Sequence, residues 1–189
     1  GNGGGGDIRG SNFYGWAEEE FKRRGFDVRL PEGGMPDPMR ARESVWVPYI
    51  MDELRAGPDT VLVGHSSGAA AALRVAEARR LRGLVLVAPY DDDLGDELER
   101  ASGYFSRPFD WDAIRGNCGF VLQFTGRRDA LVPVAVQRRV ADALRLSRPE
   151  DGDAGGPLAA RFAYHEQPTG DHFFEPPFPE LPEAVEAGL

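Results

Sequence analysis

Residues 60–80 read TVLVGHSSGAAAALRVAEARR: a short β-branched run, a Gly-His-Ser-Ser-Gly turn and an alanine-rich segment. This order predicts a buried strand that turns sharply into a helix. The turn fits the Gly-x-Ser-x-Gly pattern of a nucleophile elbow, in which the central serine, Ser66, sits at a strained backbone position and flanking glycines let strand and helix pass closely. The alternative is a glycine-rich helix N-cap, because serine is a favoured capping residue.

Outward from this turn, the chain alternates apolar strands with amphipathic helices. We expect strands at residues 26–30, 61–63, 84–88, 120–124 and 161–165, and helices at about 13–25, 43–54, 67–80, 134–146 and 182–187. Continuous apolar strands between amphipathic helices are typical of a parallel sheet covered on both faces. The sequence therefore predicts an α/β fold, and its length of 189 residues fits a single domain, residues 1–189.

Composition and charge narrow the function classes. With 22 basic against 31 acidic residues and a formal net charge of -9, the chain lacks the basic surface that neutralises nucleic-acid phosphates. No apolar run approaches the length of a membrane span, and the first residues do not resemble a secretion signal. The single cysteine, Cys118, excludes an internal disulfide and fits a reducing compartment. We therefore expect a cytoplasmic protein that binds neither nucleic acid nor membrane.

A serine hydroxyl becomes an effective nucleophile only when a base takes its proton, and the chain has three histidines. His65 precedes Ser66 in the turn, where we expect its side chain to point away from the serine. His165 lies inside a predicted strand, which suits a structural role. His172 follows the last strand in a loop, at the sheet edge where the turn also lies, and the sequence favours it as the base.

The acid that orients such a base should lie between the serine and the histidine in chain order. Asp129 follows the strand that ends at residue 124 and precedes a helix, which places it at the same sheet edge. A run of four other acids is more simply a solvated helix start: Asp91, Asp92, Asp93 and Asp96. Asp171 adjoins His172 in sequence and could not easily orient it. The residues thus predict a triad of Ser66, Asp129 and His172.

Short motifs in one order extend along nearly the whole chain: GNGGG (1–5), YGW (14–16), MPDP (35–38), ARESVW (41–46), VGHSSGA (63–69), DLGDELERASGYFSRPF (93–109), NC (117–118), QF (123–124) and DHF (171–173). In these motifs the chain resembles the retinoblastoma-binding protein nine family of serine hydrolases. The resemblance implies an α/β-hydrolase-like three-layer sandwich with a mostly parallel central sheet. It also implies hydrolysis of a small ester or amide, without metal or organic cofactor, by Ser66, Asp129 and His172.

Two departures from the family pattern affect these expectations. The family has a strand before its glycine loop, whereas this sequence opens on the loop itself at Gly1, so we expect the first strand to be missing. The family's contact with the retinoblastoma protein depends on a Leu-x-Cys-x-Glu motif, and the matching residues 54–58 read LRAGP. We therefore expect no retinoblastoma-protein contact.

The implied fold uses two backbone N–H groups to stabilise an oxyanion. One belongs to the residue after the nucleophile, here Ser67, and the other should come from the glycine loop, at Asn2 or Gly3.

A short cap-like segment is expected at about residues 89–117. Its aromatic side chains would either wall a compact apolar pocket, which predicts short or aromatic acyl groups in the substrate, or pack the cap onto the body: Tyr90, Tyr104, Phe105, Phe109 and Trp111. The rival to a serine hydrolase is a non-catalytic interaction scaffold that retains the fold.

Overall fold

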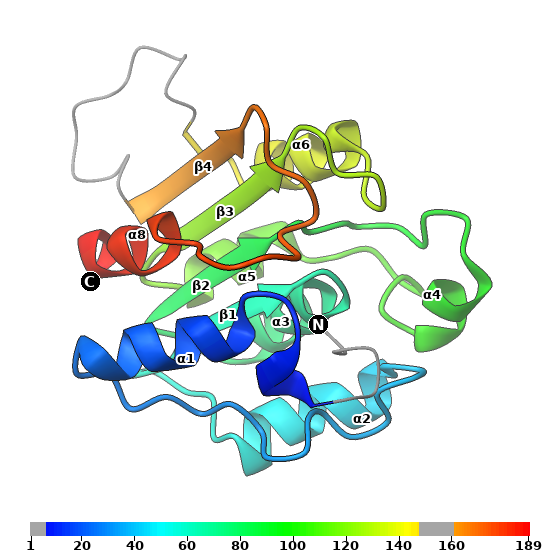
Figure 1. Ribbon diagram of the computed structural model, residues 1–189. Helices are drawn as coiled ribbons and strands as arrows, with labels where there is room; N and C mark the ends of the chain where they lie inside the picture. Colours follow the sequence, from blue (N-terminus) through cyan, green and yellow to red (C-terminus); the bar gives the residue numbers. More distant parts are fainter. Residues whose placement is uncertain (1–6, 148–160) are drawn as a thin grey trace.

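The computed structural model describes residues 7–147 and 161–189. In these ranges one sheet has four strands in the order β1-β2-β3-β4 (Figure 1). The strands are β1 (Val61–His65), β2 (Gly83–Val87), β3 (Val121–Gly126) and β4 (Phe162–Gln167). Neighbouring strands all pair in parallel, so their carboxyl ends share one edge of the sheet. Four of the expected strands are thereby confirmed, with ends shifted by one or two residues.

Helices cover both faces of the sheet, as expected for a three-layer fold (Figure 1). One face carries α2 (Glu43–Pro48), α3 (Ser67–Ala78), α5 (Trp111–Asn117) and α6 (Val134–Ala143), and the other carries α1 (Tyr14–Arg23) and α8 (Glu180–Gly188). The shorter elements are η2 (Ile8–Gly10), η3 (Tyr49–Glu53) and α4 (Glu97–Ser102). Within the described ranges, no helix is long and apolar enough to cross a lipid bilayer.

Small residues let α3 lie close against the sheet. A Cβ atom on Gly64 would lie 2.4 Å from the carbonyl oxygen of Gly68 and 2.8 Å from Cα of Ala69, so any other residue would collide with the helix backbone. The alanines at residues 69–72 are all completely or almost completely buried. This close approach makes the turn between β1 and α3 sharp.

The prediction of a strand at residues 26–30 is wrong. This segment pairs with no strand in the described part of the chain, although its exposure alternates as a strand's would. Phe26 packs on Phe21 of α1, and an apolar cavity of about 270 Å³ lies between the segment, α1 and β1. Alternation indicates only that every second residue faces the interior. A β-strand also needs a neighbouring strand with which its backbone can form hydrogen bonds.

The single helix predicted at residues 43–54 is two elements in the structure. The α-helix ends at Pro48, and the chain continues as the π-helix η3, in which the N–H of Leu54 donates to the carbonyl of Tyr49 over 3.0 Å. Proline has no N–H to donate within the helix, so one backbone hydrogen bond is missing at the point where the α-helix changes to a π-helix.

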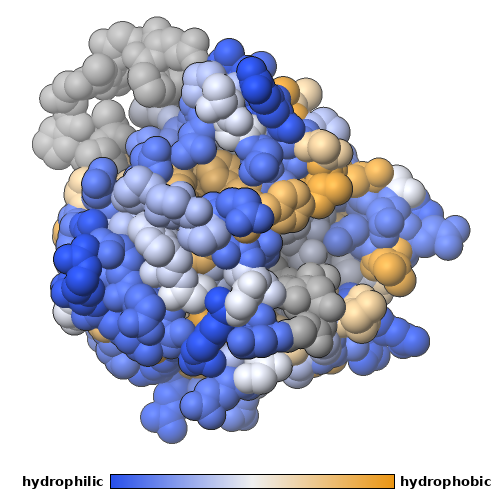
Figure 2. Space-filling model, in the orientation of Figure 1, coloured by the Kyte–Doolittle hydropathy of each residue, from blue (hydrophilic) through white to orange (hydrophobic). Residues whose placement is uncertain are grey.

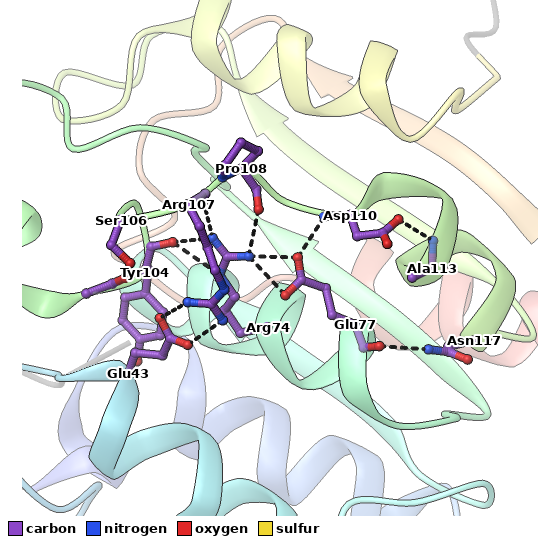
Figure 3. A network of polar contacts seen from close by, with 11 residues as sticks. Glu43, Arg74, Glu77, Tyr104, Ser106, Arg107, Pro108, Asp110, Ala113 and Asn117 are labelled. Carbon is purple, nitrogen blue, oxygen red and sulfur yellow. Dashed lines mark hydrogen bonds and ion pairs between the residues drawn. The ribbon is translucent and has the colours of Figure 1, made fainter.

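Arg74 of α3 fastens the connection between β2 and β3 to the body of the protein (Figure 3). Its guanidinium donates to three backbone carbonyls, those of Tyr104, Arg107 and Pro108. It also pairs with Glu77 at 2.7 Å, and the Glu77 carboxylate accepts a hydrogen bond from the N–H of Asp110 at 2.7 Å. Arg74 is 2% exposed, so its buried charge depends on these partners.

Candidate active site

Ser66 joins β1 to α3 in a strained conformation. Its backbone has φ 56° and ψ -125°, a region that costs a residue with a side chain about 1–3 kcal/mol. Its N–H donates to the carbonyl of Val87 at 3.0 Å, and its own carbonyl accepts from the N–H of Ala69 at 2.7 Å. In the described part of the chain its side chain makes no capping hydrogen bond to α3, which argues against the N-cap alternative. The backbone therefore fixes this residue and leaves its hydroxyl free of the helix.

Asp129 lies in the loop after β3, with its carboxylate completely buried. One oxygen accepts from the N–H groups of Leu131 and Val132 at 2.8 and 2.9 Å. The other accepts from His172 Nδ1 at 2.8 Å and from Gln137 Nε2 at 3.0 Å. Burial raises the pKa of Asp129, but the hydrogen bonds from His172 and the two N–H groups more than offset it, so the pKa lies below its ordinary value.

Gln137 of α6 is a functional candidate that the sequence analysis missed. It is completely buried, and besides Asp129 its Nε2 donates to the carbonyl of Val132 at 2.9 Å. A glutamine in an amphipathic helix is easily assigned to the solvent side. The helical spacing nevertheless indicates burial, because residue 137 shares a helix face with the buried Val140 and Ala141, three and four positions later.

The loop after β4 carries His172 back across the sheet edge toward β1 (Figure 1). The loop passes directly over Gly126 at the end of β3, where a Cβ atom would lie 1.9 Å from the carbonyl oxygen of Asp171. At its far side, His65 Nε2 lies 2.8 Å from the carbonyl oxygen of His172. A carboxylate only accepts, so Nδ1 of His172 carries the proton shared with Asp129 and leaves Nε2 as the acceptor of the neutral ring.

The structure thus brings Asp129 and His172 into direct contact, and it places Ser66 next to the residue that touches the His172 backbone. Among the described residues, no hydrogen bond joins Ser66 Oγ to His172 Nε2. Such contacts are often long in enzymes without a bound substrate and tighten in the complex.

Ser67, the first residue of α3, has its side chain engaged by Glu99 and Tyr90. Its hydroxyl lies 3.3 Å from Glu99 Oε1 of α4 and accepts from the Tyr90 hydroxyl at 3.2 Å. Burial raises the pKa of Glu99 above its ordinary value. The backbone N–H of Ser67 lies at the helix N-terminus, where helical N–H groups lack intrahelical partners. Asn2 and Gly3, the other expected oxyanion donors, lie outside the described residues.

The competing acids have structural partners. Asp91 and Asp92 both pair with Arg139 of α6, and Asp93 pairs with Arg100. Asp96 caps α4 by accepting from two backbone N–H groups.

Of the remaining polar candidates, Asp171 accepts from the N–H of Phe173 at 2.8 Å, and His165 stacks on Phe124 with 4.8 Å between ring centroids. Burial raises the pKa of the Cys118 thiol to about 12, which keeps it protonated and unreactive. Among the described residues, no group of three or more His, Cys, Asp or Glu side chains could hold a metal ion.

The aromatic residues of the connection between β2 and β3 pack that connection onto the body. Tyr90, Tyr104 and Phe109 are buried, and the Arg74 guanidinium lies 3.8 Å from the centre of the Phe109 ring. Phe109 also packs on Trp111, with 5.2 Å between ring centroids. Of the two roles expected for these rings, the structure supports packing.

Comparisons with known proteins agree with this fold. The model of the alpha/beta hydrolase family matches residues 13–187. The serine hydrolase RBBP9 of Rattus norvegicus is 46% identical over 142 residues, which cover 75% of this chain and 75% of the rat protein. The crystal structure of the ydeN gene product from B. subtilis has a TM-score of 0.77 at 19% identity, covering 94% of this chain and 90% of that one, and it supports the fold alone. The chain belongs to the alpha/beta hydrolase family and is a serine hydrolase related to the rat protein.

Proposed function

We propose that this serine hydrolase cleaves a small ester or amide with Ser66 as nucleophile, His172 as base and Asp129 as the acid that orients the base. The observation that carries the proposal is the 2.8 Å hydrogen bond from His172 Nδ1 to the buried Asp129 carboxylate, at the sheet edge where Ser66 also lies. A serine, an acid and a histidine that follow parallel strands in this chain order have the roles required for acyl transfer.

In the proposed mechanism, Nε2 of His172 takes the hydroxyl proton of Ser66 as the oxygen attacks the substrate carbonyl. Asp129 holds the imidazole tautomer and stabilises the imidazolium that forms. His172 then gives the proton to the leaving alcohol or amine, which leaves an acyl group on Ser66. Water, deprotonated by His172, attacks this acyl-enzyme and releases the acid.

The tetrahedral oxyanion would be stabilised by backbone donors. The N–H of Ser67 is one, because α3 begins at this residue and its N-terminus favours negative charge. We propose Asn2 or Gly3 of the glycine loop as the other. Each donor of this kind is worth about 3 kcal/mol in the transition state.

We propose that the substrate is compact and apolar around its reacting carbonyl. Two large apolar side chains flank the acid and base, Leu131 at 58% exposed and Phe174 at 42% exposed, each two residues beyond its triad neighbour. Figure 2 shows hydrophobic surface gathered over the loops after β3 and β4 on an otherwise largely hydrophilic face. The connection after β2, which we take as a short cap, is packed against α3, and we expect so short a cap not to enclose a long acyl chain.

The proposed setting is the cytoplasm, with a small-molecule substrate as the partner. The net charge of -9 opposes nucleic-acid binding, and the sequence LRAGP at residues 54–58 lacks the motif for the retinoblastoma protein.

Labelling by a fluorophosphonate probe tests the proposal. The wild-type protein should be labelled, Ser66→Ala should not, and the matched control Ser67→Ala should keep much of the labelling because its backbone N–H remains. Nitrophenyl esters of increasing acyl length should give the highest kcat/KM for short acyl groups. A wild-type protein that reacts with neither probe nor esters would indicate a non-catalytic scaffold, and rising kcat/KM into long chains would overturn the compact substrate.

A further inference from the structure

His65 connects three separate parts of the molecule through its two ring nitrogens. Nε2 lies 2.8 Å from the carbonyl oxygen of His172, and Nδ1 lies 2.7 Å from the hydroxyl of Tyr14, at the start of α1. A carbonyl oxygen only accepts, so Nε2 carries the proton, and Nδ1 of the neutral ring accepts from the tyrosine. The direction of both hydrogen bonds is therefore determined by their partners.

Burial keeps both groups in these protonation states. His65 is 3% exposed, and burial, with a smaller effect of the neighbouring His172 ring, holds the pKa of His65 well below its ordinary value. Burial raises the pKa of Tyr14 to about 12, so its hydroxyl remains a donor. Phe13 packs against the His65 ring with 5.4 Å between centroids and shields it from water.

The sheet topology gives this connection its importance. Ser66 follows β1 and His172 follows β4, and these are the two outer strands of the described sheet. Three strand spacings separate their ends by roughly 14 Å. The loop after β4 must bring the base back over this distance. In the described part of the chain it meets the turn at Ser66 through His65, by this hydrogen bond and by the packing of the His65 and His172 rings at 4.9 Å between centroids.

We propose that His65 is a positioning residue that sets the base against the nucleophile, by holding the backbone of His172 from the position adjacent to Ser66, with Tyr14 fixing its tautomer. This inference rests on the proposed roles of Ser66 and His172. His65 does not touch the substrate or exchange a proton with it. Its hydrogen bond keeps the loop that carries His172 at a fixed position relative to the turn that carries Ser66.

A second, partly buried histidine supplies a control. His165 of β4 stacks on Phe124, and in the described part of the chain its Nε2 has no hydrogen-bond partner. Replacing His165 by leucine removes the same imidazole from the interior without removing a bridge. The pair His65→Leu and His165→Leu therefore separates the loss of a hydrogen-bonded bridge from the loss of an imidazole packed at the sheet.

The kinetic test measures kcat and KM on nitrophenyl acetate for four variants. His65→Leu should lower kcat by about 10- to 100-fold with little change in KM, because a displaced catalytic group slows the chemical step more than it weakens substrate binding. His65→Gln, whose amide nitrogen can replace the Nε2 donor, should recover most of that loss. Tyr14→Phe should lower kcat by only about 2- to 5-fold, and His165→Leu should leave it unchanged.

A spectroscopic test on the same variants does not depend on activity. The proton on His172 Nδ1, shared with Asp129, should give a downfield proton NMR resonance in the wild-type protein and in His165→Leu, and that resonance should broaden or disappear in His65→Leu. If His65→Leu does not fold, as thermal melts will show, Tyr14→Phe takes its place with a partial loss of both signals. An unchanged resonance or an unchanged kcat in the folded variant would overturn the proposal. An inactive wild-type protein that still shows the His65-dependent resonance would overturn the proposed function alone.

Discussion

On the β1 side of the sheet the backbone conformation holds the candidate nucleophile, whereas on the β3 and β4 side a set of hydrogen bonds to the Asp129 carboxylate holds the candidate acid and base. Ser66 is fixed by its strained φ and ψ and by the close approach of α3 to Gly64. Asp129 is fixed by four N–H donors, two from the backbone and two from the side chains of His172 and Gln137.

The two sides also differ in how deeply their strands are buried. β1 borders the apolar cavity of about 270 Å³, and Val63 in this strand is 37% exposed. Every residue of β3 is buried. Because steric constraints fix Ser66 and hydrogen bonds fix Asp129, we expect added side-chain volume to disrupt the turn at Ser66. We expect the loss of a polar group to disrupt the pair of Asp129 and His172. Each prediction below tests one half of this contrast.

The largest effect is expected on the polar side, from Asp129→Asn. This change keeps the shape but favours the wrong imidazole tautomer, and kcat should fall by about 10⁴-fold. The control is Asp92→Asn, which alters an exposed acid paired with Arg139 and should leave kcat near wild type. If the control lost activity and Asp129→Asn kept it, the assignment of the acid would be wrong.

On the nucleophile side, Gly64→Ala should lower the free energy of unfolding by about 1–3 kcal/mol or prevent folding, because the new Cβ would lie 2.4 Å from the carbonyl oxygen of Gly68. Denaturant unfolding measures the change. The matched control is Gly116→Ala in α5, where, apart from the backbone of its own helix and its chain neighbours, no described atom lies within 4 Å of the new Cβ, and alanine should stabilise the helix by about 1 kcal/mol. Equal stabilities for the two variants would contradict a backbone-held elbow.

A smaller effect is expected from Gln137→Met, which removes one of the four donors to Asp129. The remaining donors keep the carboxylate in place only loosely, and we expect kcat to fall by about tenfold. Gln123→Met makes the same change one step further away, because Gln123 Nε2 donates to the carbonyl of Gln137 and does not touch Asp129. A loss from Gln123→Met as large as that from Gln137→Met would indicate a general packing defect.

The smallest effect concerns stability at low pH. Hydrogen bonds from Arg138, with others from Tyr164 and Arg127, lower the pKa of Glu166 from 4.5 to about 2. The unfolded chain binds this proton at higher pH than the folded one, so the stabilisation is complete above pH 4.5 and is lost as the pH falls toward 2. The melting temperature of Glu166→Gln should lie about 2–4 °C below wild type at neutral pH. The difference should shrink as the pH falls, and a constant difference would contradict this linkage.

The sequence predicted the turn at Ser66 and four of the strands, because neighbouring residues determine each of these features. The turn at Ser66 carries its own glycines, and strands are recognisable before both Asp129 and His172, a largely apolar run at residues 120–124 and a mixed one at 161–165, so the shared edge of a parallel sheet could be inferred. Residues 26–30 show where such inference fails. Their alternation can be read from the local sequence, but whether another strand lies beside them depends on residues far away in the chain. The bond from His65 to the backbone of His172 joins residues 107 positions apart, and no spacing rule indicates it.

The central claim is that Ser66 carries the acyl group during turnover, and mass spectrometry tests it most directly. Protein quenched during the hydrolysis of a nitrophenyl ester should gain the mass of one acyl group, and fragmentation of the peptide from the β1–α3 turn should place it on Ser66. His172→Ala should reduce this adduct strongly. An acyl group mapped to Ser67 or to another residue, or turnover without any adduct in the wild type and in a variant that slows deacylation, would contradict the account.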